Sequence, residues 1–146
     1  MFYPDALIEA LTLVFTWKTM MWVAIGVTIG VGAGAIPGLT ATGGVALVLP
    51  LTFVMETAPA LGLIIGLYKG AIYGGSISAI SFATPGTPEA AATVWDGYKM
   101  MRTGKGRKAL LMALYSSVTA DSLSDVITII IAPLMAIIAL SFGPSE

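Results

Sequence analysis

The sequence predicts an all-α protein that crosses a membrane several times. Hydrophobic residues make up 57% of the 146 residues, only 10% are charged, and the mean hydropathy is +0.92; soluble domains are about 25% charged. Residues 19–55, 57–87 and 109–145 carry few or no charges. A membrane-spanning helix needs about 20 largely apolar residues, so these stretches are long enough for several membrane-spanning helices. Prolines and glycines interrupt these stretches, which predicts broken or re-entrant helices.

Residues 1–18 are predicted to form an amphipathic helix. Asp5, Glu9, Thr12 and Thr16 recur at helical spacing and form one polar stripe on an otherwise apolar helix. This pattern favours a helix that lies along the membrane surface. The alternative is a helix that packs its apolar face on neighbouring spans.

Residues 19–98 are predicted to form a membrane segment with broken helices. Its first span, residues 20–36, has Gly26, Gly30 and Gly34 on one face, which favours close helix packing. Pro37-Gly38 then breaks the helix and frees backbone carbonyls. The apolar residues 45–55 are too few to span alone and form either a re-entrant segment or the second half of a broken span.

The next span, residues 58–83, also has glycines at helical spacing on one face and ends in a second helix break. Four glycines stand at four-residue intervals from Gly62 to Gly74, and Thr84-Pro85-Gly86-Thr87-Pro88 follows. We expect Thr84, Thr87 and the backbone around Gly86 to form a polar tip at membrane depth that binds a cation or a carboxylate. The alternative is an ordinary turn at the membrane surface.

A basic loop at residues 99–108 separates this segment from the last one, residues 109–146. Short loops rich in Lys and Arg stay in the cytoplasm, so the loop orients the protein. A patch that attracts anionic lipid or substrate is the alternative. Residues 109–131 are long enough to span, and Pro133 starts or kinks a shorter apolar piece. The basic residues of the loop are Lys99, Arg102, Lys105, Arg107 and Lys108.

Three charged residues stand inside apolar stretches. Lys69 should face a cavity or a partner, where its ammonium and the Ser76 hydroxyl, two turns along the same face, could hold a carboxylate. Alternatively, Lys69 pairs with Glu56, Asp121 or Asp125, or snorkels to the surface. Asp121 and Asp125 share one helix face and are either a site for the coupling cation or residues near the membrane interface.

Several classes of function are excluded by composition. The chain has no Cys, His, Asn or Gln, so thiolate and imidazole metal sites are absent, and we predict no metal centre and no cofactor. A net charge of −1 offers no surface for nucleic acid. No catalytic constellation is visible, so we predict that the protein is not an enzyme.

A series of short motifs, in this order, resembles the N-terminal part of the TctA family, the large membrane subunit of tripartite tricarboxylate transporters. The resemblance covers about residues 26–146. The chain departs from the family at Ala83, where Asn is usual, at Thr40-Ala41, where Gly-Pro is usual, and at Lys69, where an aromatic residue is common. The matching motifs are Pro37-Gly38-Leu39-Thr40, residues 46–53, residues 73–77, residues 84–88, residues 91–93, Asp96-Gly97-Tyr98 and Phe142-Gly143-Pro144.

This resemblance implies a multi-pass secondary transporter of the bacterial inner membrane, built from two inverted repeats, of which this chain would supply one. It implies carboxylate substrates delivered by a periplasmic binding protein, a small membrane subunit, a second half carried by another chain, and a gradient of Na⁺ or H⁺. The alternatives are a truncated or split membrane subunit that docks without transporting, and an oligomeric channel.

The expected site is built from Pro37–Thr42 and Ser76–Thr87, together with Lys69. The candidates for coupling the cation are Thr84, Thr87, Asp121 and Asp125. The expected substrate-binding residues are Lys69, Ser76, Ser78, Thr84, Gly86, Thr87, Gly38, Thr40 and Thr42.

Overall fold

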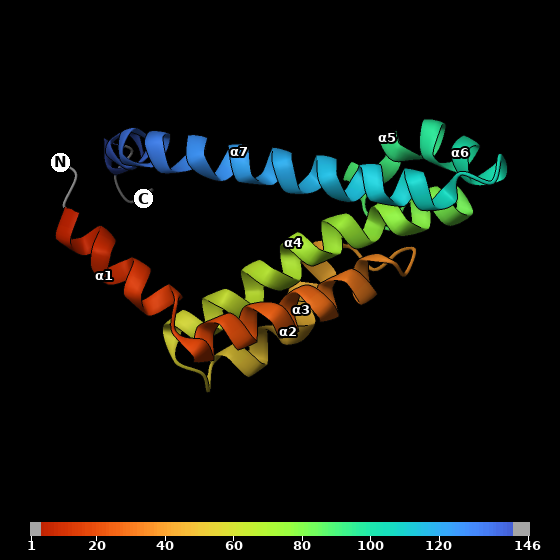
Figure 1. The fold of residues 1–146 in the computed structure, drawn as a ribbon. Helices are drawn as coiled ribbons and strands as arrows, with labels where there is room; N and C mark the ends of the chain where they lie inside the picture. The colour runs from red at the N-terminus through yellow and green to blue at the C-terminus, as the bar shows by residue number, and fades with distance from the viewer. Residues whose placement is uncertain (1–3, 142–146) are drawn as a thin grey trace.

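The structure, a computed structural model, describes residues 4–141, and the regular elements in this range are all helices (Figure 1). The predicted all-α class is therefore confirmed. In chain order the helices are α1 (Pro4–Val14), α2 (Trp17–Gly34), α3 (Ala41–Thr52), α4 (Thr57–Phe82), η1 (Pro88–Ala90), α5 (Ala91–Thr93), the π-helical turn η2 (Val94–Tyr98), α6 (Lys99–Arg102) and α7 (Gly106–Ser141).

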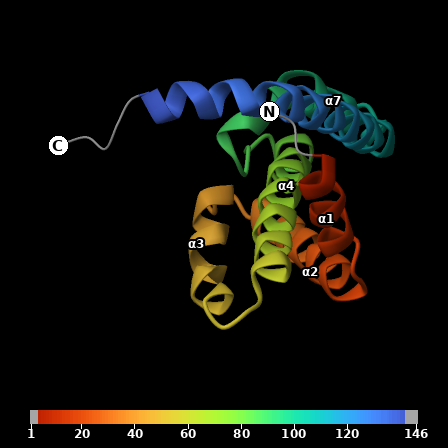
Figure 2. The ribbon, with the colours of Figure 1, turned by 90° about the vertical axis from the view of Figure 1, so that its left-hand side faces the viewer.

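Helix α4 is the centre of the fold. Figure 2 shows α3 on one side of α4 and α1 and α2 on the other, with α7 crossing above. The side chains of Leu63, Leu67 and Ile80, all on α4, are fully buried. The core therefore follows one helix that is long and apolar enough to cross a membrane.

Helices α2 and α4 lie side by side and run in the same direction. Gly26 of α2 lies against Leu63 of α4, and Gly34 lies against Ala71, eight residues further along each helix. Contacts that advance together along both helices define a parallel pair. Because consecutive parallel helices need a return path, the chain must cross back between them.

The parallel pair packs backbone against backbone. A Cβ atom added at Gly66 would lie 2.6 Å from the Val23 carbonyl oxygen, and one added at Gly30 would collide with the Leu67 carbonyl. Glycine permits this approach and leaves its Cα hydrogens to contact carbonyl oxygens, as in small-residue packing within bilayers. The glycines that meet a carbonyl of the other helix are Gly26, Gly30, Gly34, Gly66, Gly70 and Gly74.

Helix α3 is the return path. It begins after the break at Pro37-Gly38, and Thr40 caps it by accepting a hydrogen bond from the Gly43 backbone N–H at 3.1 Å. Its 12 residues extend about 18 Å, which is too short to cross the hydrocarbon core. Gly44 packs α3 onto Leu67 of α4. The second apolar run is thus a short, separate helix.

Helix α1 meets α2 at a sharp corner. The two helices are bent by 63° at a short break and can be counted as one bent span. Thr16 stabilises the corner, because its hydroxyl donates to the Leu13 carbonyl at 2.9 Å and lies 2.8 Å from the Thr19 hydroxyl. A change of direction here is what an interfacial helix requires, and its position at the membrane surface stays a prediction.

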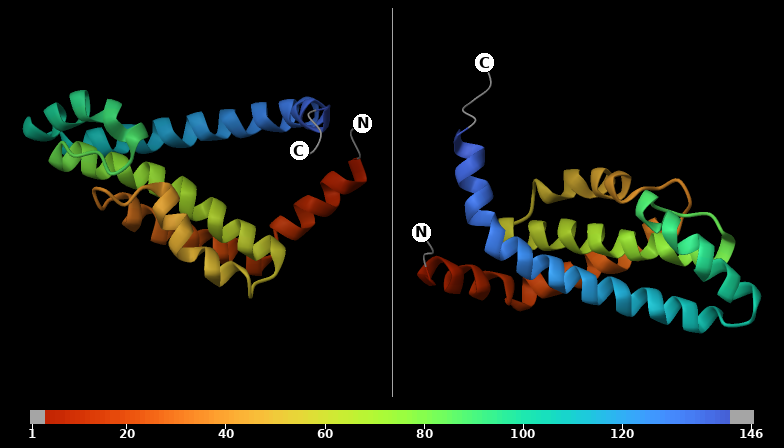
Figure 3. Two further views of the ribbon diagram at one scale, coloured as in Figure 1. Left: turned by 180° about the vertical axis from the view of Figure 1, so that it is seen from behind. Right: turned by 90° about the horizontal axis from the view of Figure 1, so that it is seen from above.

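Helix α7 runs back over α4 and then separates from it (Figure 3). Ala109, near its start, is buried, whereas Val126 and Ile130 are exposed. Residues Gly106–Pro133 form the second helix that is apolar enough to span a membrane, and together with the bent pair the described residues supply two or three spans. The helix continues past Pro133 to Ser141.

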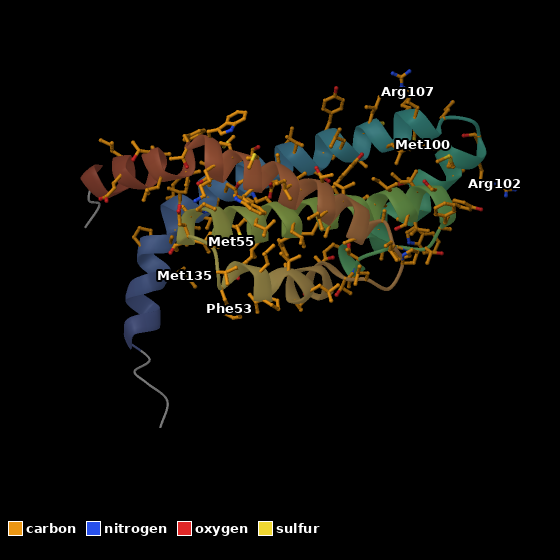
Figure 4. The ribbon with its side chains drawn as sticks, turned by 90° about the horizontal axis from the view of Figure 1, so that it is seen from below. Phe53, Met55, Met100, Arg102, Arg107 and Met135 are labelled. Carbon is orange, nitrogen blue, oxygen red and sulfur yellow. The ribbon has the colours of Figure 1, made fainter. Side chains whose placement is uncertain are left out.

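The two ends of the α2–α4 pair carry different charges. At the end where both helices begin, Lys18 and Glu56 form an ion pair at 2.6 Å. At the other end lies the basic segment, where Arg102 and Arg107 project away from the molecule and from Phe53 at the opposite end (Figure 4). Positive residues favour the cytoplasm, so we expect α2 and α4 to end on the cytoplasmic side.

We predict that Gly30→Ala lowers the free energy of unfolding by about 1–3 kcal/mol, because the new methyl group meets the α4 backbone, which cannot move aside alone. The matched control is Gly32→Ala, whose Cβ would have no atom within 4 Å and which should stabilise α2 by up to about 1 kcal/mol.

Unfolding of both variants in detergent, titrated with dodecyl sulfate, measures the difference. Equal effects of the two substitutions would show that α2 does not touch α4 as described.

Candidate functional site

The segment after α4 folds back onto the helices that precede it. Helix α4 ends at Phe82, and the next residue, Ala83, caps it in the left-handed conformation with φ 55°. The chain then reverses, and the Gly86 N–H donates to the Gly75 carbonyl at 3.3 Å. Gly75 lies about two turns before the end of α4, so the loop reaches roughly 10 Å back along the helix.

Two glycines allow this close approach. A Cβ atom at Gly75 would lie 2.5 Å from the Thr87 Oγ1 atom, and one at Gly86 would collide with the Gly34 carbonyl oxygen at the end of α2. The loop therefore packs between the C-terminal end of α2 and the body of α4. Gly34 and Gly86 are the residues at which the first helix break meets the second.

The loop buries one threonine and exposes the other. The Thr87 side chain is 2% exposed and its hydroxyl has no hydrogen-bond partner among the described residues. Thr84 is exposed, and its hydroxyl donates to the Phe82 carbonyl at 3.3 Å. The Ser78 hydroxyl is buried and donates to the Gly75 carbonyl at 3.0 Å. Of the predicted site residues, Ser78, Gly86 and Thr87 come together, and Thr84 lies outside the cluster.

The predicted residues of the first break have other places. Gly38, with φ 91°, has open space around its Cα atom and supplies the turn after α2. Thr40 is used to cap α3, and Thr42 is exposed in its first turn. The first break contributes to the loop site through the end of α2 rather than through these three residues.

Lys69 is held by both aspartates of α7. Its ammonium donates to Asp121 at 2.7 Å and to Asp125 at 2.6 Å, and the three side chains are between one-third and three-fifths exposed. This is one of the pairings that the sequence left open. Two carboxylates and one ammonium leave one negative charge, so the cluster is better suited to a cation than to a carboxylate. A role for Lys69 in binding substrate stays a prediction.

Ser76 lies in a separate cavity of about 330 Å³ between α4, η2 and α7. The cavity is lined by four hydroxyl groups and one carboxylate, and Lys69 is not among its lining residues. This arrangement therefore does not show Lys69 and Ser76 together at one site, as would be needed for both to bind the same carboxylate. The polar residues of the cavity are Ser76, Thr93, Asp96, Ser116 and Ser117.

Sequence reasoning missed most of this cavity. The π-helical turn η2 widens the chain at Val94–Tyr98, and π-turns occur often at functional sites. Gly97 lets this turn approach α4, because a Cβ there would lie 2.6 Å from the Ile80 side chain. Two adjacent serines in an apolar helix, Ser116 and Ser117, were the signal that could have indicated a polar cavity.

Comparison with known proteins identifies one family. Residues 20–146 match the family described as the Tripartite tricarboxylate transporter TctA family. A protein of Agrobacterium vitis, described as an uncharacterized 52.8 kDa protein in the TAR-I ttuC' 3' region, is 38% identical over 127 residues. The match covers 87% of this chain and 25% of that relative, so the chain spans about a quarter of its length. No solved structure matches.

We predict that Ala83→Asn raises the free energy of unfolding by about 0.5–1 kcal/mol, because asparagine tolerates the left-handed conformation that costs alanine about 1 kcal/mol. Ala46→Asn is the control, since Ala46 is exposed within α3 and asparagine should lower stability there by a few tenths of a kcal/mol. Titration with dodecyl sulfate measures both. A loss of stability in Ala83→Asn as large as in Ala46→Asn would contradict the assigned geometry.

We predict that Lys69→Met destabilises the protein by about 1 kcal/mol, because it leaves two neighbouring carboxylates without a cation. Adding Asp121→Asn and Asp125→Asn to Lys69→Met should restore most of the loss, which a thermodynamic cycle in detergent measures.

The triple variant also tests Lys69 in binding. If the triple variant recovers its stability but added carboxylates no longer protect it against unfolding, Lys69 contacts substrate. If it recovers both its stability and this protection, the lysine serves to join α4 to α7. A triple variant no more stable than Lys69→Met would contradict the ion cluster itself.

Proposed function

This chain belongs to the tripartite tricarboxylate transporter TctA family, and we propose on that basis that it is part of a secondary transporter for tricarboxylates or related carboxylates in the bacterial inner membrane. A cation gradient drives the transport. The observation that carries the proposal is the polar loop Thr84–Thr87, which is folded into an apolar pair of parallel helices.

The arrangement of the helix breaks supports a transport role. Irregular backbone at membrane depth is tolerated where it is enclosed by protein or lines a water-filled cavity, and transporters place their substrates and ions at such breaks. Here the end of α2 and the loop after α4 meet at Gly34 and Gly86. The carbonyl at the end of α2 favours a cation, and the neighbouring cavity around Ser76 is polar, with four hydroxyl groups and the Asp96 carboxylate.

The proposal includes partners, because the family is that of a tripartite transporter and the chain spans about a quarter of its relative's length. A periplasmic binding protein delivers the carboxylate, a small membrane subunit joins the assembly, and further transmembrane segments supply the second half of the site. The exposed apolar side chains of α7, among them Val126 and Ile130, are where those segments would pack. Nothing in the site suggests bond-making chemistry, and we propose transport without catalysis.

Uptake by proteoliposomes tests the proposal. Liposomes that hold this chain with the remaining membrane segments and the small subunit should accumulate labelled tricarboxylates or dicarboxylates when the binding protein and an inward cation gradient are supplied. The matched control omits only this chain.

Each failure points to one of the other functions. Carboxylate flux that needs neither the binding protein nor a gradient would indicate a channel. A complete assembly that binds this chain but accumulates no carboxylate with or without it would indicate a docking subunit.

A further inference from the structure

The buried hydroxyl of Thr87 requires an explanation. Its side chain is 2% exposed, and within the described part of the chain Oγ1 is the buried side-chain polar atom that has no hydrogen bond. Burying an unpaired hydroxyl costs about 1–3 kcal/mol. Thr84, three residues earlier in the same loop, satisfies its hydroxyl on a backbone carbonyl. The position of Thr87 is therefore a place where a ligand would recover lost free energy.

Oxygen atoms from three segments gather around this hydroxyl. Thr87 Oγ1 lies over Gly75 of α4, and the Gly75 carbonyl accepts hydrogen bonds from Ser78 Oγ and the Gly86 N–H. Gly86 in turn lies against both Ser78 Oγ and the Gly34 carbonyl. Hydroxyl and carbonyl oxygens of α2 and α4 thus lie against the loop at Gly86 and Thr87.

The electrostatics of this point favour a positive charge. Gly34 is the last residue of α2, and its carbonyl, unlike those of Val31 and Ala33, accepts no backbone hydrogen bond from the turn that follows the helix. The helix dipole is negative at this end. Carbonyls and hydroxyls are hard oxygen ligands, and ends of broken helices coordinate Na⁺ in other transporters. The arrangement presents a cation with neutral oxygens and no competing basic side chain among these residues.

We infer that Thr87 Oγ1, Ser78 Oγ and the Gly34 carbonyl at the end of α2 form a sodium site. This inference rests on the proposed function, because it names the ion whose gradient drives transport. None of the groups at the site can take up a proton near neutral pH, so the site selects a metal cation rather than H⁺. The carboxylates that could carry a proton, Asp121 and Asp125, are already bound to Lys69.

Sodium binding to the full 146-residue chain tests the inference without any transport measurement. The unfolding temperature in detergent is followed while sodium chloride replaces choline chloride at constant ionic strength. Sodium should raise it, as a ligand of the folded state does. Thr87→Val should weaken apparent sodium affinity about tenfold or more, Thr87→Ser should retain it, and Ser78→Ala should weaken it.

Thr28→Val is the matched control, because Thr28 is exposed on α2 and its hydroxyl already donates to the Ala24 carbonyl. Its sodium response should equal that of the wild type. The inference is overturned if Thr87→Val keeps the wild-type sodium affinity, or if Thr28→Val loses as much affinity as Thr87→Val. It is also overturned if the unfolding temperature of the wild type does not change as sodium replaces choline. If Thr87→Val does not fold, Ser78→Ala decides: an unchanged affinity overturns the inference.

The result is separable from the transport proposal. Sodium binding that depends on Thr87, combined with no carboxylate uptake, would support the ion site and contradict the transporter. Uptake driven by a proton gradient without sodium would support the transporter and contradict the ion site.

Discussion

Backbone contact between α2 and α4 is the interaction on which the other features of the structure depend. In a bilayer, lipid tails are as apolar as leucine, so helices associate through close packing rather than through the hydrophobic effect. Six glycines bring the two backbones together. Because the helices are parallel, the chain must return between them, and the short helix α3 does so. The break at Pro37-Gly38 follows from this requirement.

The same contact positions the candidate site between the end of α2 and the body of α4. With α2 held in register against α4, Gly34 stands close enough to Gly75 for the loop around Gly86 to touch both. The polar atoms there are neutral oxygens, whereas the charged residues of the apolar region, Lys69 and its two aspartates, form an ion cluster at an earlier position on α4. The residues that join α4 to α7 are therefore distinct from those that we propose to bind the ion.

Several features of the site could be predicted because they depend on local sequence. The threonines on either side of Pro85-Gly86 indicated a polar loop, and the isolated charge of Lys69 indicated a partner. The choice between Thr84 and Thr87 could not be predicted, because it depends on how the loop turns after Ala83. The partner of Lys69 depended on α7 running back along α4, which brings together residues more than 50 positions apart.

The sequence by itself determined the membrane class, the approximate positions of the apolar helices, the two breaks and the glycine faces, because hydropathy and helical periodicity are properties of neighbouring residues. Tertiary structure alone decided that the glycine faces meet in parallel, that Ser76 belongs to a different cavity from Lys69, and that the chain widens into a π-turn at Val94–Tyr98. These features depend on the register between helices, which long-range packing sets.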